Sequence, residues 1–202
     1  MTKIFIGIPT IDGKVNAELM MRMIEWSYKY SSNLIIEYQP FTIPHDHARN
    51  ILVKKFLDTD ATHFLSIDAD VVPPVNTITK MLHADKDFVT ARIDRFVATD
   101  KGYDLAPMMF LYNGTNYDVQ YNFTEIDLIR IDGAGAGCFM VKRKVLEKIK
   151  QPFKFIYNED GIIARSEDLY FCDKLRENNF ELWADYSINC KHIKQIDVSL
   201  LK

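Results

Sequence analysis

The sequence predicts an α/β fold in which a doubly wound sheet is flanked by helices within a single domain. Three observations indicate it. The first third of the chain alternates strand and helix patterns in the order β-α-β-α-β, which is typical of parallel sheets covered by helices. The 202 residues suffice for one well-packed core but are few for two domains. The sequence contains no internal repeat, low-complexity segment or Ser/Gly-rich linker that would divide it.

Each element of the first third follows from a local pattern. Residues 4–8 are an apolar run that ends at Pro9, and residues 34–36 and 63–67 are similar runs, so we expect three strands. Asn16 can cap a helix that follows the first strand. The apolar residues that recur in that helix at helical spacing are Ala17, Met20, Met21, Ile24 and Tyr28. A second helix has the apolar face Ala48, Ile51, Leu52 and Phe56.

The second half of the chain is richer in strands. Two helices are expected there, one from Arg143 and one from Glu167. The strand patterns lie at residues 108–112, 126–131, 138–141 and 180–184. We therefore expect an α/β first half joined to a more mixed second half, which together form a mixed sheet.

Composition and charge exclude several classes of protein. Hydrophobic residues make up 48% of the chain and charged residues 26%, as in ordinary soluble domains. The net charge of −3 and the lack of a basic stripe argue against a nucleic-acid partner. The one dense basic cluster, at residues 142–144, opens an expected helix, and we interpret it as a solvated face. No apolar stretch approaches the roughly 18 residues that a membrane span needs.

The cysteines and the N-terminal segment favour a cytoplasmic protein. Cys138, Cys172 and Cys190 are odd in number and widely spaced, which fits neither a disulfide framework nor a CxxC metal site. We expect reduced thiols that pack in the core of a protein kept in a reducing compartment. The apolar start of the chain ends at Pro9 without a cleavage-site pattern, so we interpret it as a strand rather than a signal peptide.

Position distinguishes one of three Asp-x-Asp pairs. Asp68 and Asp70 directly follow the strand at 63–67, and an α/β sheet places its active site at that end of its strands. In an extended chain, residues two apart point to the same side, so both carboxylates can reach one Mg²⁺ or Mn²⁺ ion. The alternative is a solvated acidic turn. The other two pairs, which we interpret as turns, are Asp58/Asp60 and Asp85/Asp87.

Acidic residues also begin the last expected helix. Glu167 and Asp168 follow Ser166, although acidic side chains at a helix N-terminus are often there for the helix dipole alone. His192 follows near the end of the chain, where a histidine is otherwise more often an ordinary surface residue. Residues 45–47, His-Asp-His, have no second His or Cys pair at ligand spacing, so we expect loop groups beside the site rather than zinc ligands.

Four blocks of the sequence, taken in chain order, resemble the GT-A glycosyltransferases, particularly their family-two-like members. The blocks cover most of the chain: Ile8-Pro9-Thr10, Ala48-Arg49-Asn50, Asp68-Ala69-Asp70, and Glu167-Asp168 leading to His192. The stretch from Gly133 to Val141 is similar to the small-residue loop and strand before the family's acceptor helix. The resemblance implies a single GT-A domain, compact like virus- or phage-encoded sugar transferases. Its nucleotide-binding half would cover about residues 1–72 and its acceptor and metal half about residues 73–202.

The resemblance also implies a role for each matching residue. Those expected to bind the donor are Pro9, Thr10, Asp12, Arg49 and Asp68, and those expected to bind the metal are Asp68, Asp70 and His192. The imidazole favours Mn²⁺ slightly over Mg²⁺. Asp168 matches the general base of inverting members, with Glu167 as its catalytic neighbour. In an enzyme that retains configuration, these two acids would only orient the sugar.

We therefore expect a metal-dependent glycosyltransferase with Mn²⁺ or Mg²⁺ as its cofactor. It would move a sugar from a nucleoside diphosphate sugar, with a UDP-sugar favoured, to a hydroxyl of a glycan or other acceptor. The chain ends ten residues after His192, so we expect the middle segment, a further domain or a partner subunit to recognise the acceptor. A virus-encoded enzyme of this kind would work in the host cytoplasm.

Two other functions stay open on the sequence alone. One is a non-catalytic module that binds sugar nucleotides or carbohydrate, because one fold hosts active and inactive members. The other is a sugar-nucleotide pyrophosphorylase on a related fold. Such enzymes carry a Gly-rich loop with Arg or Lys after the first strand, where this chain has Pro9 to Gly13 instead.

Overall fold

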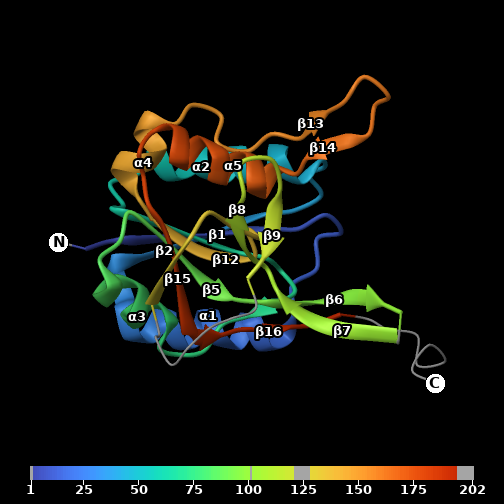
Figure 1. Cartoon of the computed structure of the whole chain (residues 1–202). Coiled ribbons are helices and arrows are strands. Elements are labelled where there is room, and N and C mark those ends of the chain that lie inside the picture. Colours follow the sequence, from blue (N-terminus) through green and yellow to red (C-terminus); the bar gives the residue numbers. More distant parts are fainter. Residues whose placement is uncertain (1, 101, 121–127, 195–202) are drawn as a thin grey trace.

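A seven-stranded mixed sheet runs through the centre of the computed structural model (Figure 1). The structure describes residues 2–100, 102–120 and 128–194. The strand order is β10-β15-β5-β12-β3-β1-β2. In chain order these strands are β1 (Ile4–Pro9), β2 (Leu34–Gln39), β3 (His63–Ile67), β5 (Phe88–Arg92), β10 (Leu128–Ile131), β12 (Cys138–Lys142) and β15 (Leu182–Asn189).

Parallel pairing joins the strands of the first third. β1 pairs in parallel with β2 and β3, so that Ile4 lies between Leu34 and His63. β12 then enters antiparallel between β3 and β5, which makes the sheet mixed. The predicted parallel start and the predicted mixed sheet are both confirmed.

Helices cover both faces of the sheet (Figure 1). α1 (Ala17–Tyr30) and α3 (Thr77–Ala84) lie on one face, while α2 (His45–Leu57), α4 (Arg143–Lys148) and α5 (Glu167–Glu177) lie on the other. Each face has its own apolar cluster. Trp26 of α1 belongs to one cluster, and Phe56 of α2 and Phe171 of α5 belong to the other. The chain is thus one three-layered α/β domain, as predicted.

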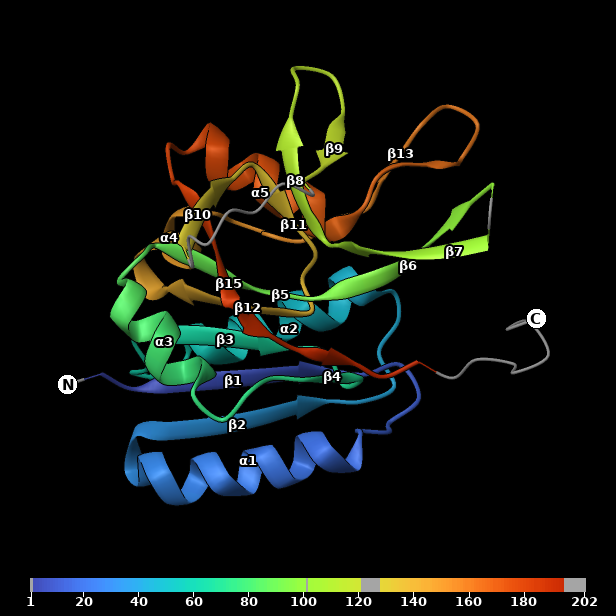
Figure 2. The same ribbon diagram turned by 60° about the horizontal axis from the view of Figure 1, so that its bottom comes forward.

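Short strands surround the end of the sheet toward which β1 and β2 point. β8 (Met109–Tyr112), β9 (Tyr117–Val119) and β11 (Gly133–Ala134) form a small sheet. The hairpins pair β6 (Asp94–Thr99) with β7 (Gly102–Pro107) and β13 (Ile156–Tyr157) with β14 (Ile163–Arg165). β16 (Lys191–His192) pairs antiparallel with β4 (Val71–Val72). Figure 2 shows the two hairpins and β16 on this same side of the molecule.

Helix α1 lies where predicted but buries a different face. Its buried side chains are Leu19, Met23 and Trp26. The large indole takes the core side, where its Nε1 donates a hydrogen bond to the Val75 carbonyl oxygen at 2.8 Å. Four of the apolar residues whose spacing predicts the helix are therefore exposed: Met20, Met21, Ile24 and Tyr28.

The basic cluster at residues 142–144 is only partly the solvated face that the sequence predicts. Lys144 is exposed, but Arg143 is partly buried and stacks over the Phe56 ring at 5.0 Å. The Arg143 Nε donates to the Ala61 carbonyl oxygen at 3.1 Å, and its Nη2 donates to the Thr59 carbonyl oxygen. The Arg143 Nη2 also donates to the carbonyl oxygen of Leu57, the last residue of α2, at 3.3 Å, so Arg143 caps that helix end and the predicted solvated role is wrong for this residue.

Other expectations differ from the structure mainly at the element boundaries. The strand expected at 126–131 appears as β10 from Leu128, and residues 126 and 127 lie outside the described part of the chain. Residues 45–47, expected in a loop, form the first turn of α2, in which the Ala48 N–H donates to the carbonyl oxygen of the N-cap residue Pro44 at 3.4 Å. The three cysteines are buried free thiols, as predicted. No helix in the described ranges is long and apolar enough to cross a bilayer.

Candidate active site

A cleft of about 760 Å³ lies at the carboxyl ends of β1 and β3. Its walls come from the loop after β1, the turn after β3, the helices α2 and α5, and residues 192–194. The cleft gathers every residue that sequence analysis places in the site: Pro9, Thr10, Asp12, Arg49, Asp68, Asp70, Glu167, Asp168 and His192. Five separate parts of the sequence thus meet in one place, while the role of each residue stays a prediction.

Hydrogen bonds fix the loop after β1. Thr10 is buried, and its hydroxyl donates to the Lys14 carbonyl oxygen at 3.0 Å. The Asp12 carboxylate accepts a hydrogen bond from the Lys14 N–H at 3.0 Å, and this bond holds the pKa of Asp12 below its ordinary value. The Asn16 N–H donates to the Ala69 carbonyl oxygen at 2.9 Å. The loop is therefore joined directly to the turn after β3.

That turn separates the two aspartates of the Asp-x-Asp motif. The Val71 N–H donates to the Asp68 carbonyl oxygen at 3.0 Å, so residues 68–71 form a turn rather than an extended chain. The Asp68 carboxylate reaches Arg49, whereas the Asp70 carboxylate meets side chains of the C-terminal segment. The extended geometry assumed from the sequence is wrong, and an ion shared by both aspartates stays a prediction.

Arg49 is a buried link between two acidic segments. The residue is 3% exposed, its Nη2 donates to Asp68 Oδ1 at 2.8 Å, and its Nε lies 3.5 Å from Glu167 Oε1. Its Nη1 lies 3.3 Å from both the Ser66 hydroxyl and the Ala136 carbonyl oxygen. Burial opposes the guanidinium charge, but the two carboxylates outweigh it and raise the pKa of Arg49. The guanidinium is thus directed at the protein's own acids, and its contact with a donor stays a prediction.

The first turn of α5 brings Glu167 and Asp168 into the cleft in different environments. Burial raises the pKa of the Glu167 carboxyl, although Arg49 counteracts that effect. Asp168 is only partly buried. Its Oδ1 accepts hydrogen bonds from the Ser166 hydroxyl and, at 2.8 Å, from the Leu169 N–H. Asp168 is therefore the acid of this pair that is both oriented and open to the cleft.

His192 and Asp70 form the pair best suited to a cation. The His192 Nδ1 lies 2.9 Å from the Asp94 carbonyl oxygen, and because that oxygen only accepts, Nδ1 carries a proton. The His192 Nε2 then faces Asp70 Oδ2 at 3.6 Å, and the pairing raises the pKa of His192. Burial disfavours the ionised Asp70, but His192 and Lys194 outweigh it and hold the pKa of Asp70 well below its usual range.

This donor set fits a divalent metal as a partial set of ligands. A carbonyl oxygen that holds the second nitrogen of a histidine is the usual outer-shell arrangement of a metal ligand. A carboxylate with an imidazole suits Mn²⁺, and less strongly Mg²⁺. Among the residues that the structure describes, no group of three or more His, Cys, Asp or Glu side chains converges on one ion. The protein would supply few ligands, and bound phosphate and water the others.

Sequence analysis missed several residues that line the cleft. They include Lys14, Met108, Phe155 and Lys194. The sequence could have indicated Lys194, because it lies two residues after His192 and side chains two apart in an extended segment point to the same side. Met108 and Phe155 have none, since they reach the cleft only at the roots of the β6–β7 and β13–β14 hairpins.

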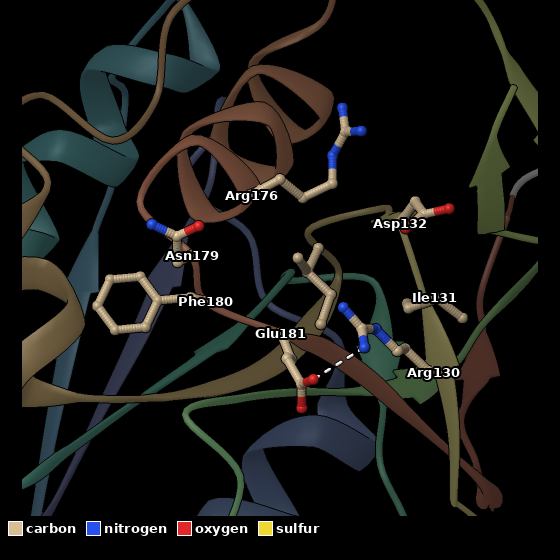
Figure 3. Close-up of a pocket in the computed structure, with 8 residues that line it drawn as sticks. Arg130, Ile131, Asp132, Arg176, Asn179, Phe180 and Glu181 are labelled. Atoms are coloured by element: carbon tan, nitrogen blue, oxygen red, sulfur yellow. Dashed lines mark ion pairs between the residues drawn. The ribbon is translucent and has the colours of Figure 1, made fainter. Parts of the chain in front are cut away.

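A second hollow, of about 320 Å³, lies at the other end of α5 (Figure 3). It is lined by Arg176 and Asn179 near the end of that helix, and by Arg130 and Glu181, which form an ion pair at 2.8 Å. No residue that the sequence predicts to act in the site lines this hollow. The cleft at the N-terminus of α5 is therefore the candidate active site.

Comparison with known proteins identifies the fold. No protein-family model and no curated protein matches the chain. Among solved structures, A197 from STIV matches with a TM-score of 0.63 and 20% identity, over 96% of this chain and 87% of that one. GalNAc-T7 with UDP, GalNAc and Mn²⁺ matches with a TM-score of 0.57 and 13% identity over 98% of this chain. TarS 1–349 of S. aureus with UDP-GlcNAc matches with a TM-score of 0.56 and 12% identity over 97% of this chain.

These likenesses show that the chain has the GT-A fold, as predicted. The chain spans 45% of the GalNAc-T7 chain, 60% of the TarS chain and 87% of the A197 chain. At such low identities the likeness establishes the fold alone, and the activity has to be argued from the site.

Replacement of Arg49 tests its role as a buried link. Arg49→Met is expected to lower the free energy of unfolding by about 3 kcal/mol, because Asp68 and Glu167 lose their counter-charge. Adding Glu167→Gln should recover part of that loss, since it removes one unpaired carboxylate. Urea unfolding of the single and double variants measures the coupling. The control Arg130→Met breaks an exposed ion pair and should lower the free energy of unfolding by less than about 1 kcal/mol. If the double variant loses the sum of the two free energies that Arg49→Met and Glu167→Gln lose singly, the two residues are not coupled and the link is contradicted.

Proposed function

We propose that this chain is a metal-dependent glycosyltransferase. It moves a hexosyl group from a nucleoside diphosphate sugar, with a UDP-sugar favoured, to a hydroxyl of a glycan acceptor. The observation that carries the proposal is that one cleft holds both a paired carboxylate and imidazole, Asp70 with His192, and a separately oriented carboxylate, Asp168. The GT-A fold supports the reaction class, and the UDP and UDP-GlcNAc bound to GalNAc-T7 and TarS support the class of donor.

On this proposal the donor diphosphate lies against the turn after β3. Asp70 and the His192 Nε2 would hold Mn²⁺ or Mg²⁺, with Asp68 near both the ion and the ribose. When bound, the ion would neutralise the negative charge that develops on the departing nucleoside diphosphate. Pro9 at the end of β1, and Thr10 and Asp12 in the fixed loop after it, would bind the base and ribose.

The acceptor hydroxyl would approach Asp168. The Ser166 hydroxyl and the Leu169 N–H hold one carboxylate oxygen of Asp168, and the N-terminus of α5 favours its ionised form. Asp168 would accept the proton of the acceptor hydroxyl as that oxygen bonds to the anomeric carbon, while the bond from this carbon to the diphosphate oxygen breaks and the nucleoside diphosphate leaves with the electron pair. Glu167 acts on the reaction through Arg49, which keeps α5 in place. Acceptor recognition would fall to segments around the cleft, or to a further domain or subunit.

Removal of the metal ligand is expected to abolish donor binding. In calorimetric titrations, UDP should bind the wild-type chain with Mn²⁺ but not with EDTA, and Asp70→Ala should lose the Mn²⁺-dependent binding because the ion loses its carboxylate. Asp58→Ala removes an exposed aspartate outside the cleft and should behave as wild type. UDP binding that is unaffected by EDTA would contradict the metal dependence.

Removal of the base is expected to separate binding from turnover. Asp168→Asn should still bind UDP-sugar but slow sugar transfer, or donor hydrolysis without acceptor, by about 10²–10⁴-fold. Asp160→Asn, on the exposed β13–β14 hairpin, is the control. A wild-type chain that binds donor but never cleaves it would indicate a binding module. Pyrophosphate release from a nucleoside triphosphate and a sugar phosphate would indicate a pyrophosphorylase.

The affinity for Mn²⁺ is expected to rise with pH. Asp70 raises the pKa of His192 above its ordinary value, and the ion must displace the proton from Nε2, so binding weakens as pH falls through that pKa. Electron paramagnetic resonance titrations over about pH 5 to 8 measure the slope. His192→Gln should bind Mn²⁺ more weakly and with a flatter pH dependence. A slope as steep as that of the wild type in this variant would show that another group titrates.

A further inference from the structure

Asp70 is already paired with a side-chain cation in this structure. The Lys194 Nζ lies 2.5 Å from Asp70 Oδ2, the same oxygen that the His192 Nε2 approaches at 3.6 Å. An ammonium group has no lone pair with which to bind a metal. A divalent ion on this oxygen of Asp70 would repel the ammonium at close range, so we expect metal binding there to displace Lys194 from Oδ2.

The backbone just before Lys194 is held in place, while the Lys194 side chain has room to move. β16 pairs with β4, and the Ile193 N–H donates to the Asp70 carbonyl oxygen at 2.8 Å. The Lys194 side chain is 48% exposed and lines the cleft. Its flexible four-carbon stem allows the ammonium to leave Asp70 and stay within the cleft while the backbone keeps its place.

The charges that line the cleft indicate where the ammonium would go. The carboxylates are Asp12, Asp68, Asp70, Glu167 and Asp168, and the side chains that stay cationic are Arg49, Lys14 and Lys194. With neutral histidines these five negative and three positive groups give a formal charge of −2, which one divalent ion would cancel. A diphosphate then brings further negative charge. Arg49 is committed to Asp68 and Glu167, and Lys14 lies 3.7 Å from Asp12. Lys194 is the cation that metal binding at Asp70 would release.

We propose that Lys194 is a further diphosphate-binding residue, which holds Asp70 while the metal is absent and passes to the phosphate oxygens when metal and nucleotide bind together. The inference rests on the proposed function for its ligand, a nucleoside diphosphate. Lys194 would compete with free metal for Asp70 and would strengthen nucleotide binding once the metal is in place. These two effects have opposite signs, which an ordinary surface ion pair would not produce.

Lys194→Met in the full chain tests both effects. Without nucleotide it is expected to bind Mn²⁺ about two- to fivefold more tightly than the wild type, because Asp70 loses its competing ammonium. With saturating Mn²⁺ it is expected to bind UDP about tenfold more weakly, because a charge-assisted hydrogen bond to phosphate is lost. Lys194→Arg keeps the charge and should lie near the wild type in both titrations. Electron paramagnetic resonance measures bound Mn²⁺, and calorimetry measures UDP binding.

Lys191→Met is the matched control. Lys191 precedes Lys194 in the same segment and is exposed, but it pairs with Glu18 at 2.6 Å outside the cleft, so its removal should change neither affinity. If the wild type binds both ligands and Lys194→Met leaves both affinities unchanged, or weakens both, this inference is overturned while the proposed function stands. If the wild type binds neither Mn²⁺ nor UDP, the proposed function fails and this inference fails with it.

Discussion

The buried guanidinium of Arg49 is the interaction on which the candidate site depends. It joins the turn after β3, through Asp68, to the start of α5, through Glu167, and it also donates to the Ala136 carbonyl before β12. Buried charges are tolerated only when they are paired, so these three segments have to meet for the core beneath them to be stable. The segment that would face the metal and the helix that would carry the base therefore share one anchor, and folding itself assembles the cleft.

Around this anchor the protein places neighbouring acids in different environments. Glu167 is buried against Arg49, and burial raises the pKa of its carboxyl. Asp168, the next residue, is partly exposed at the first turn of α5. Asp70 stays ionised because His192 and Lys194 lie beside it. Acids that differ in this way are typical of sites that must bind a cation and accept a proton a short distance apart.

Local patterns predicted most of the central sheet, because buried strands leave continuous apolar runs between turn residues. They also placed the acidic pairs at the ends of a strand and a helix, where an α/β fold builds its sites. The local patterns failed where contacts between residues far apart in the sequence determine the structure. Trp26 sets which face of α1 is buried, and Arg143 closes the end of α2. No local signal marks the pairing of Arg49 with Glu167, since their segments meet only in the folded chain.

The central claim is that a divalent ion binds between Asp70 and His192 beside a diphosphate. Anomalous diffraction at the manganese edge, from crystals grown with Mn²⁺ and UDP, tests it most directly. The account predicts one peak within bonding distance of an Asp70 carboxylate oxygen and the His192 Nε2, about 2.0–2.2 Å from each, with phosphate oxygens completing the coordination. A peak at another acidic pair, or a cleft in which UDP is bound and Lys194 still holds Asp70 with no ion present, would contradict it.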